Sequence, residues 1–201
     1  MSISQKNKKE KKIVIFASGS GSNTEKIIRY FENSEEVKVA AVFSNRKKAK
    51  VLRRAFDLDV KALHFDREAF YHTNEVLHVL LDINPDLIVL AGFLWLMPES
   101  IIKAFPTRII NIHPALLPNY GGKGMFGMNV HNAIIANKEK ESGITIHYVN
   151  ERFDEGNSIF QAKISISEKD SPESLASKIH ELEHQHFPIV IEKILLENND
   201  S

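Results

Sequence analysis

The stretch that decides the fold spans residues 13–23 and reads Ile13-Val14-Ile15-Phe16-Ala17-Ser18-Gly19-Ser20-Gly21-Ser22-Asn23. Its first five residues are apolar, a pattern that predicts a buried strand. The glycine-containing turn after them leads into a helical pattern that continues to Phe31. A strand, a glycine loop and a helix in this order expose backbone amides that favour an anion.

The same rhythm of short apolar runs and helix-length patterns continues along the chain. Strands are predicted near residues 13–17, 37–43, 60–63, 86–91 and 108–112, with helices near 23–33, 46–56, 67–83 and 98–104. Alternation of this kind predicts a mostly parallel sheet with crossover helices on both faces.

Beyond residue 128 the pattern changes. A helix near 129–137 is followed by two successive strands, 143–149 and 158–166, which predicts antiparallel pairing. A last helix is predicted over 172–196, with Ser171 as its N-cap and Pro188 expected to kink or split it. We therefore expect a single-domain α/β protein of Rossmann-like type, parallel in its N-terminal half and antiparallel in its C-terminal half.

Charge and composition limit the possible functions. The 26 basic and 26 acidic residues balance, but residues 1–12 hold five lysines and one acid, so residues 13–201 carry a net charge of −4. We expect the tail, 1–12, to be disordered, and 13–201 to form the domain. A net negative domain disfavours nucleic-acid binding, and no segment approaches membrane-spanning length. The absence of cysteine fits a cytoplasmic location.

Three polar residues suggest chemistry. Asn111 and His113 lie two positions apart at the end of an apolar run, so they project from the same face if that run is a strand. Asp154 follows in Phe153-Asp154-Glu155-Gly156. An amide donor, an imidazole and a carboxylate together suit a reaction that passes through an oxyanion while protons move.

A glycine-rich segment follows these residues. Residues 121–127 hold four of the nine glycines in the chain, which predicts a mobile lid. Elsewhere the histidines suggest no metal site: His180 and His184 have the spacing of a zinc face but lack a third ligand. We interpret His147, in an alternating strand pattern, as a structural histidine.

The glycine loop leaves alternatives open. It lacks the third glycine of a dinucleotide-binding fingerprint, and Ser44-Asn45-Arg46 offers no acid for the ribose of NAD. The loop therefore has three possible roles. It could bind a phosphate monoester, it could bind a dinucleotide with a 2′-phosphate next to Arg46, or it could be a purely structural turn.

Taken together, these residues resemble the phosphoribosylglycinamide formyltransferase family, the folate-dependent glycinamide ribonucleotide transformylases of purine synthesis. The resemblance covers Ile13 to about Val190. Its landmarks are Ser18-Gly19-Ser20-Gly21-Ser22-Asn23, Leu90-Ala91-Gly92-Phe93, Asn111-Ile112-His113-Pro114, Leu116-Leu117-Pro118, Phe153-Asp154-Glu155-Gly156 and Glu183-His184. The Asn-x-His element is shared with other formyltransferases and a formyltetrahydrofolate hydrolase. We expect two features to distinguish this family from those relatives. One is the phosphate loop, and the other is a chain without room for the relatives' further domains.

The resemblance implies transfer of a formyl group from 10-formyltetrahydrofolate, a co-substrate, to the amine of glycinamide ribonucleotide, without a metal. It implies that Asn111 donates to the oxyanion, that His113 polarises the formyl oxygen and transfers a proton, and that Asp154 raises the pKa of His113. The implied substrate site comprises Gly21, Ser22, Asn23 and Glu183, and the implied folate site comprises Arg67, Leu94, Trp95, Leu96, Met97 and Val149. It further implies a cis Leu117-Pro118 bond, and a monomer or homodimer without nucleic-acid or membrane partners.

The chain departs from the family pattern at several positions. Trp95 replaces an arginine that would meet the folate glutamate, which leaves Arg67 as the basic residue there, and His180 replaces a glutamine or lysine. The glycine-rich lid is longer and contains Lys123. Three alternatives stay open: another amine formyltransferase that uses 10-formyltetrahydrofolate, a non-catalytic nucleotide-binding regulator, and an NADP-dependent oxidoreductase.

Overall fold

The computed structural model describes residues 10–197, so residues 1–9 of the predicted tail lie outside it. The elements in chain order are β1 (Lys11–Phe16), α1 (Ser22–Phe31), β2 (Val37–Ser44), α2 (Lys50–Asp57), β3 (Ala62–His64), α3 (Arg67–Tyr71), α4 (Glu75–Ile83), β4 (Leu87–Leu90), α5 (Glu99–Ala104), β5 (Ile109–His113), α6 (Met128–Ala136), β6 (Glu141–Tyr148), β7 (Ser158–Ser165) and α7 (Pro172–Glu197).

One sheet of seven strands organises the molecule, in the order β3-β2-β1-β4-β5-β6-β7. The first five strands in this order are parallel, and β6 and β7 are antiparallel to their neighbours. The order changes direction between β1 and β4, because β2 and β3 lie on one side of β1 and the later strands on the other. Such a switch point leaves a crevice at the carboxyl ends of the strands. The predicted fold class is confirmed.

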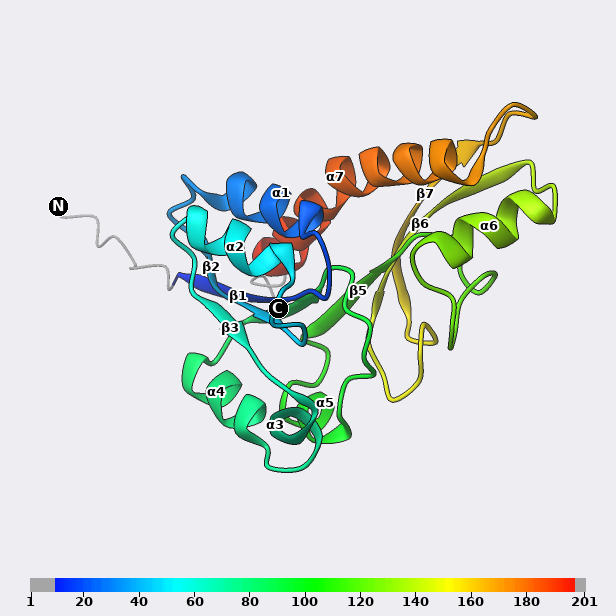
Figure 1. The fold of residues 1–201 in the computed structure, drawn as a ribbon. Helices are drawn as coiled ribbons and strands as arrows, with labels where there is room; N and C mark the ends of the chain where they lie inside the picture. The colour runs from blue at the N-terminus through cyan, green and yellow to red at the C-terminus, as the bar shows by residue number, and fades with distance from the viewer. Residues whose placement is uncertain (1–9, 198–201) are drawn as a thin grey trace, which may run out of the picture.

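Helices cover both faces of the sheet (Figure 1). Helices α1, α2 and α7 lie on one face, where Ile15, Ile27 and Ile179 contribute to the core. Helices α3, α4 and α5 lie on the other, over a second core that includes Phe16 and Phe43. The alternation of side chains along β1 feeds both cores, which explains why that strand is apolar throughout.

Some predicted boundaries need correction. β1 begins at Lys11, so Lys11 and Lys12 belong to the sheet rather than to the tail; the Lys12 amide donates to Asp86. The single helix predicted over 67–83 is two helices, because Asn74 adopts a left-handed conformation with φ 58°. Helix α7 is not split at Pro188, and Ser171 caps its start as predicted by accepting from the Ser174 amide.

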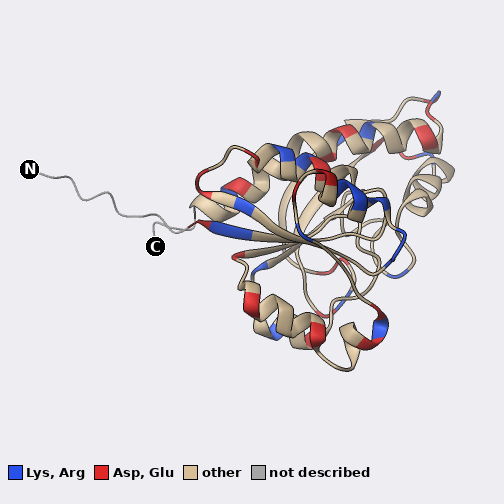
Figure 2. Ribbon diagram, turned by 60° about the vertical axis from the view of Figure 1, so that its left-hand side comes forward, with Lys and Arg blue, Asp and Glu red and all other residues tan. Residues whose placement is uncertain are grey.

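The outer surface carries both signs of charge. Basic and acidic residues are interspersed over the outer helices (Figure 2). No helix within residues 10–197 is both long enough and apolar enough to span a membrane.

Candidate active site

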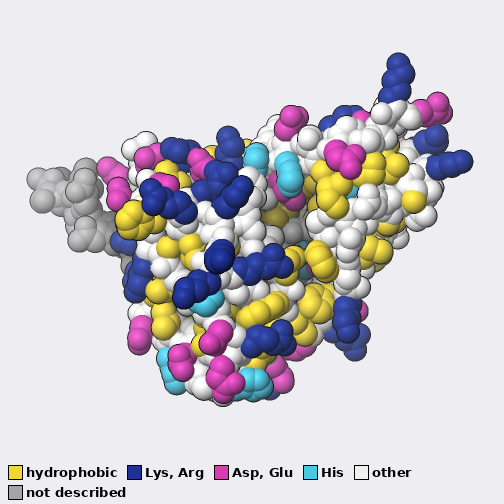
Figure 3. Space-filling view, viewed as in Figure 1, with side chains coloured by type: hydrophobic (Ala, Val, Ile, Leu, Met, Phe, Trp, Pro, Cys, Tyr) yellow, Lys and Arg dark blue, Asp and Glu magenta, His cyan; other side chains and the backbone are white. Residues whose placement is uncertain are grey.

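A cleft of about 440 Å³ opens at the carboxyl ends of the strands around the switch point. It is visible as a hollow in the middle of Figure 3, with hydrophobic side chains along its rim. Its walls come from the glycine loop after β1, the segment after β4, the end of β5, the lid, the loop after β6 and one side of α7. A cavity of this size accommodates a small-molecule ligand.

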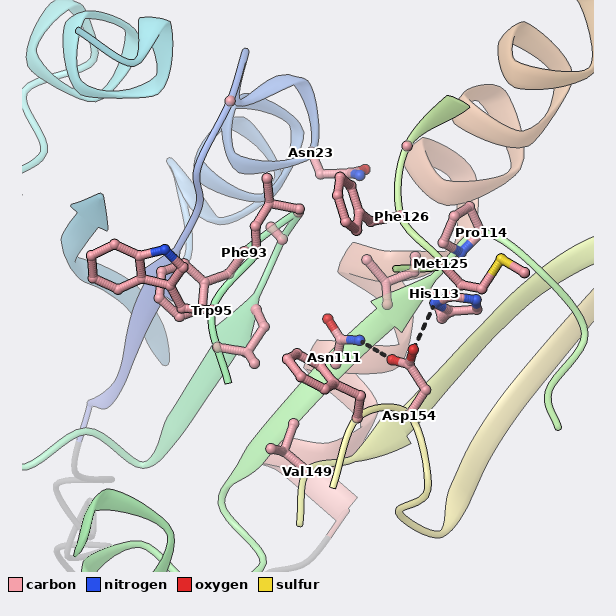
Figure 4. Close-up of a pocket in the computed structure, with 18 of the residues that line it drawn as sticks. Asn23, Phe93, Trp95, Asn111, His113, Pro114, Met125, Phe126, Val149 and Asp154 are labelled. Atoms are coloured by element: carbon pink, nitrogen blue, oxygen red, sulfur yellow. Dashed lines mark hydrogen bonds and ion pairs between the residues drawn. The ribbon is translucent and has the colours of Figure 1, made fainter. Parts of the chain in front are cut away.

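Asn111, His113 and Asp154 converge at the base of this cleft (Figure 4). Asn111 and His113 project from the same side of β5, as predicted. The Asn111 Nδ2 atom lies 3.4 Å from Asp154 Oδ1, and His113 Nδ1 lies 3.5 Å from Asp154 Oδ2. The other ring nitrogen of His113, Nε2, donates to the Tyr120 carbonyl at 2.7 Å. Asp154 is therefore the centre of the polar cluster.

The sequence around Asp154 explains how it reaches this place. Asp154, in the loop between β6 and β7, adopts a left-handed conformation with φ 58°. Gly156 packs against β6, where an added Cβ would lie 1.7 Å from the Tyr148 carbonyl oxygen. Only glycine permits that approach. The Gly122 amide then donates to Asp154 Oδ2 at 2.9 Å, which connects the carboxylate to the start of the lid.

Burial decides the electrostatics of His113. The side chain is 3% exposed, and burial lowers its pKa below 6.5, although Asp154 and the Tyr120 carbonyl act in the opposite direction. The expected rise in the pKa of His113 is therefore wrong, because the loss of hydration outweighs the neighbouring carboxylate. Burial would also raise the pKa of Asp154, but its contacts with His147, His113 and the Gly122 amide leave that pKa below its ordinary value.

His147 belongs to the same cluster, although we interpreted it from the sequence as structural. Its side chain is 2% exposed, and its Nε2 atom lies 3.1 Å from Asn111 Nδ2 and 3.6 Å from Asp154 Oδ1. Antiparallel pairing places it opposite Asn111. The missing signal was this register, since alternation along β6 alone does not tell which partner each side chain meets.

The orientation of Asn111 also differs from the expected one. Its amide nitrogen faces Asp154 and His147, and its oxygen faces the cleft (Figure 4). An oxyanion donor would direct the nitrogen into the cleft instead.

The predicted substrate residues form one end of the cleft. Gly21, Ser22, Asn23 and Glu183 all line it. Gly21 ends the loop at φ 77°, and no side chain caps the start of α1, so the first amides of this helix are available to a ligand. Asn23 Nδ2 donates to Glu183 Oε2 at 2.8 Å. Glu183 is 5% exposed, and burial raises its pKa despite the hydrogen bond from Asn23.

The predicted folate residues form the other end, with one exception. Leu94, Trp95, Leu96, Met97 and Val149 line the cleft. Arg67 is not among the described residues that line it. Its guanidinium lies 5.0 Å from the ring centroids of both Tyr71 and Trp95. Stacking of this kind fixes the direction of the guanidinium.

Two further features bear on the earlier expectations. The Leu117-Pro118 bond is cis, as the resemblance implied. His180 and His184 stack at 6.4 Å, and no group of three potential metal ligands occurs within residues 10–197.

Known proteins share both the sequence and the fold. A model of the formyl transferase family matches residues 11–191. A Bacillus subtilis phosphoribosylglycinamide formyltransferase is 34% identical over 94% of this chain and 97% of its own length. The chain belongs to the phosphoribosylglycinamide formyltransferase family. The chloroplastic Arabidopsis thaliana member is 35% identical over 91% of this chain, which spans 65% of that relative's length.

A solved structure agrees with this assignment. Glycinamide ribonucleotide transformylase 1 from Geobacillus kaustophilus superposes with a TM-score of 0.85 at 32% identity, covering 93% of this chain and 100% of the other. The resemblance drawn from the sequence is thus confirmed, and the cleft of this formyltransferase family member is its candidate active site.

Proposed function

We propose that this protein transfers the formyl group of 10-formyltetrahydrofolate to the amine of glycinamide ribonucleotide. The observation that carries the proposal is the convergence of Asn111, His113 and Asp154 at the base of one cleft, between an amide-rich loop and an apolar wall. In the reaction the amine nitrogen forms a bond to the formyl carbon, and the bond from that carbon to N10 of the folate breaks. One proton leaves the amine and N10 gains one.

The proton needs a carrier close to both nitrogens. His113 suits this role because Nε2 is committed to the Tyr120 carbonyl, which leaves Nδ1 to take up a proton. Its lowered pKa keeps the ring neutral in the free protein, so it is ready to act as a base. Asp154, 3.5 Å from Nδ1, stabilises the imidazolium that then forms.

The two ends of the cleft suit the two substrates. The free amides at the start of α1, with the positive end of the helix dipole, suit the phosphate of the ribonucleotide next to Gly21, Ser22 and Asn23. Glu183 suits the ribose or the amine. The apolar segment Leu94 to Met97, with Val149, suits the ring system of the folate.

The test is to mix the protein with glycinamide ribonucleotide and 10-formyltetrahydrofolate and to follow the loss of the formyl donor. We expect multiple turnovers without added metal. Glycinamide riboside, which lacks the phosphate, should react with a kcat/KM lower by roughly 10²-fold or more, because charge-assisted contacts at the helix start are lost. Equal reaction of both acceptors would contradict the phosphate site, and consumption of the donor only with a different amine would favour another formyltransferase activity.

Replacement of Asp154 tests the proton path. Asp154→Asn should lower kcat by roughly 10²-fold or more, because the neutral asparagine side chain cannot stabilise protonated His113 as the carboxylate does. Urea unfolding of the variant should show that the fold is retained. Glu155→Gln, at an exposed neighbouring position, is the matched control and should retain the parent kcat. A near-normal kcat for Asp154→Asn would remove this residue from the mechanism.

A further inference from the structure

The lid carries a lysine whose charge has no partner in the described part of the chain. Lys123 lines the cleft, and its side chain is exposed. Among the lysines and arginines that line the cleft within residues 10–197, the other is Arg152, which pairs with Glu155 at 3.1 Å. The ammonium group of Lys123 makes no hydrogen bond or ion pair within those residues. It is therefore available to a ligand.

The carboxylates of the cleft are engaged elsewhere. The acidic side chains that line it are Asp154 and Glu183. Asp154 accepts a hydrogen bond from the Gly122 amide and lies against His113, and Glu183 accepts from Asn23. The cleft thus offers Lys123 no free carboxylate, and an anion that meets this lysine there comes with a ligand.

The backbone on both sides of Lys123 allows its side chain to change direction. Gly122 and Gly124 flank it with φ of 92° and 91°, and an added Cβ at either position would meet no heavy atom within 4 Å. Glycine adopts positive and negative φ about equally readily. The start of this segment is nevertheless fixed, because the Gly122 amide donates to Asp154 Oδ2 at 2.9 Å. Lys123 is consequently a cation on a pivot that is anchored beside the polar cluster.

The lid leads from that cluster to the end of the cleft where we place the ribonucleotide. The chain continues from the lid into α6, which packs against α7, the helix that carries Glu183. His131 of α6 and His180 of α7 both line the cleft. The segment that holds Lys123 therefore borders the acceptor end of the cleft.

The proposed phosphate site lacks a positive charge of its own. Gly21, Ser22 and Asn23 offer backbone amides, a hydroxyl and a carboxamide, which donate hydrogen bonds but carry no formal charge. A phosphate monoester carries roughly −1.5 to −2 charges at neutral pH. Hydrogen bonds between ionised groups are about twice as strong as those between neutral groups. An ammonium group brought to this site would complete it.

We propose that Lys123 binds the phosphate of the ribonucleotide and that this contact closes the lid. This inference rests on the proposed function, and it names a residue that selects a phosphorylated acceptor. The phosphate takes no part in the bond changes, so its binding energy is available to hold the lid over the reacting groups. The ribonucleotide, rather than the folate, is then the ligand that orders the segment after Lys123.

Hydrogen exchange tests the contact without turnover. In the whole parent protein, glycinamide ribonucleotide alone, and inorganic phosphate at a higher concentration, should each slow exchange of the amides in residues 124–127. Lys123→Gln should abolish this effect. Lys169→Gln is the matched control: it removes a lysine from an exposed position between β7 and α7, outside the residues that line the cleft, and should behave as the parent.

Two results of this experiment would overturn the proposal. One is slowing of equal size in Lys123→Gln and the parent. The other is slowing by the folate alone, because a folate carboxylate would then be the partner of Lys123. Slowing by inorganic phosphate in a parent that does not formylate glycinamide ribonucleotide would support the phosphate contact and contradict the proposed function.

Kinetics with two acceptors tests whether Lys123 recognises the phosphate itself. Lys123→Gln should lower kcat/KM for glycinamide ribonucleotide by roughly 10- to 100-fold, the size expected for a lost hydrogen bond to a charged group. For glycinamide riboside the loss should be less than about 2-fold, because the group that Lys123 binds is absent. Lys123→Arg should retain most of the parent value with the ribonucleotide, since a guanidinium also binds phosphate. Equal losses with both acceptors in Lys123→Gln would show that Lys123 acts independently of the phosphate, and would overturn the proposal.

Discussion

At the scale of single residues, Gly21 shows how strictly the loop after β1 is specified. Its φ of 77° is a left-handed conformation, and an added Cβ would lie 2.4 Å from the Val51 Cγ2 atom and 2.9 Å from the Val51 Cα atom of α2. Because the second contact is with backbone, no side-chain rotation relieves it. The loop and α2 are thus packed together at this point.

Gly21→Ala should therefore destabilise the protein by roughly 2 kcal/mol or more, through left-handed strain and displacement of α2. Gly19→Ala is the matched control. Gly19 has no heavy atom within 4 Å of its Cβ position and needs no positive φ, so this variant should keep nearly the parent stability. The measurement is the free energy of unfolding from urea titrations. Equal stability of the two variants would contradict the described packing.

The sequence predicted individual residues well where one strand or one loop places them. Asn111 and His113 share a side of β5 because side chains alternate along any strand, which needs no tertiary information. His147 was missed because its place beside Asn111 depends on the β5–β6 register. Arg67 was assigned to the cleft, but its guanidinium stacks on Tyr71 and Trp95 and it is not among the described residues that line the cleft. Contacts between distant segments decide both outcomes.

At the scale of elements, the lid is hydrogen-bonded to the site near its start. The Gly122 amide donates to Asp154, whereas Lys123 and Phe126 are exposed at the rim of the cleft. Phe126 lines the cleft, and its side chain is 48% exposed. Burial of this ring would accompany closure of the lid over bound substrates.

Hydrogen exchange tests this behaviour. Amides in residues 123–127 should exchange rapidly in the free protein and more slowly when both the folate and the ribonucleotide are bound, because closure orders the segment. The Gly122 amide is an internal reference: its bond to Asp154 should protect it in both states, and Asp154→Ala should remove that protection. Equal protection of residues 123–127 with and without ligands would contradict a lid.

Element types were easier to predict than element ends. Every strand was anticipated, and every helix overlaps a predicted helical region, because hydrophobic periodicity is a local property. The break between α3 and α4 was not, since a left-handed Asn74 produces it within a continuous helical pattern. The pattern likewise could not show that α7 continues past Pro188, because packing against α1, α6 and β6 holds both halves of that helix.

At the scale of the whole molecule, the site follows from the topology. The change of direction between β1 and β4 opens the crevice, and the antiparallel return of β6 brings His147 and the Asp154 loop to the same edge. Parallel strands alone would supply the glycine loop after β1 and the apolar wall. The C-terminal antiparallel addition supplies the carboxylate, so both halves of the chain are needed for one site.

This convergence buries several histidines, which should make stability depend on pH. His131 on α6 is 3% exposed, and its Nδ1 atom has no hydrogen-bond partner in the described part of the chain. Burial first, then His180 and His113, lowers its pKa from 6.5 to about 4. A proton therefore binds the unfolded chain more readily than the folded protein throughout that interval.

The sign of the effect follows directly. Because the folded-state pKa is depressed, this contribution to stability is complete above pH 6.5 and is lost as pH falls toward about 4. The full loss amounts to roughly 3 kcal/mol at 1.36 kcal/mol per pKa unit, a large part of the stability of an ordinary domain.

Urea unfolding at about pH 7 and pH 4 should show that His131→Leu loses less stability on acidification than the parent by about this amount. His72→Gln, an exposed histidine, is the matched control and should follow the parent. If His131→Leu and the parent lose stability equally, protonation of His131 does not govern the acid sensitivity of the fold.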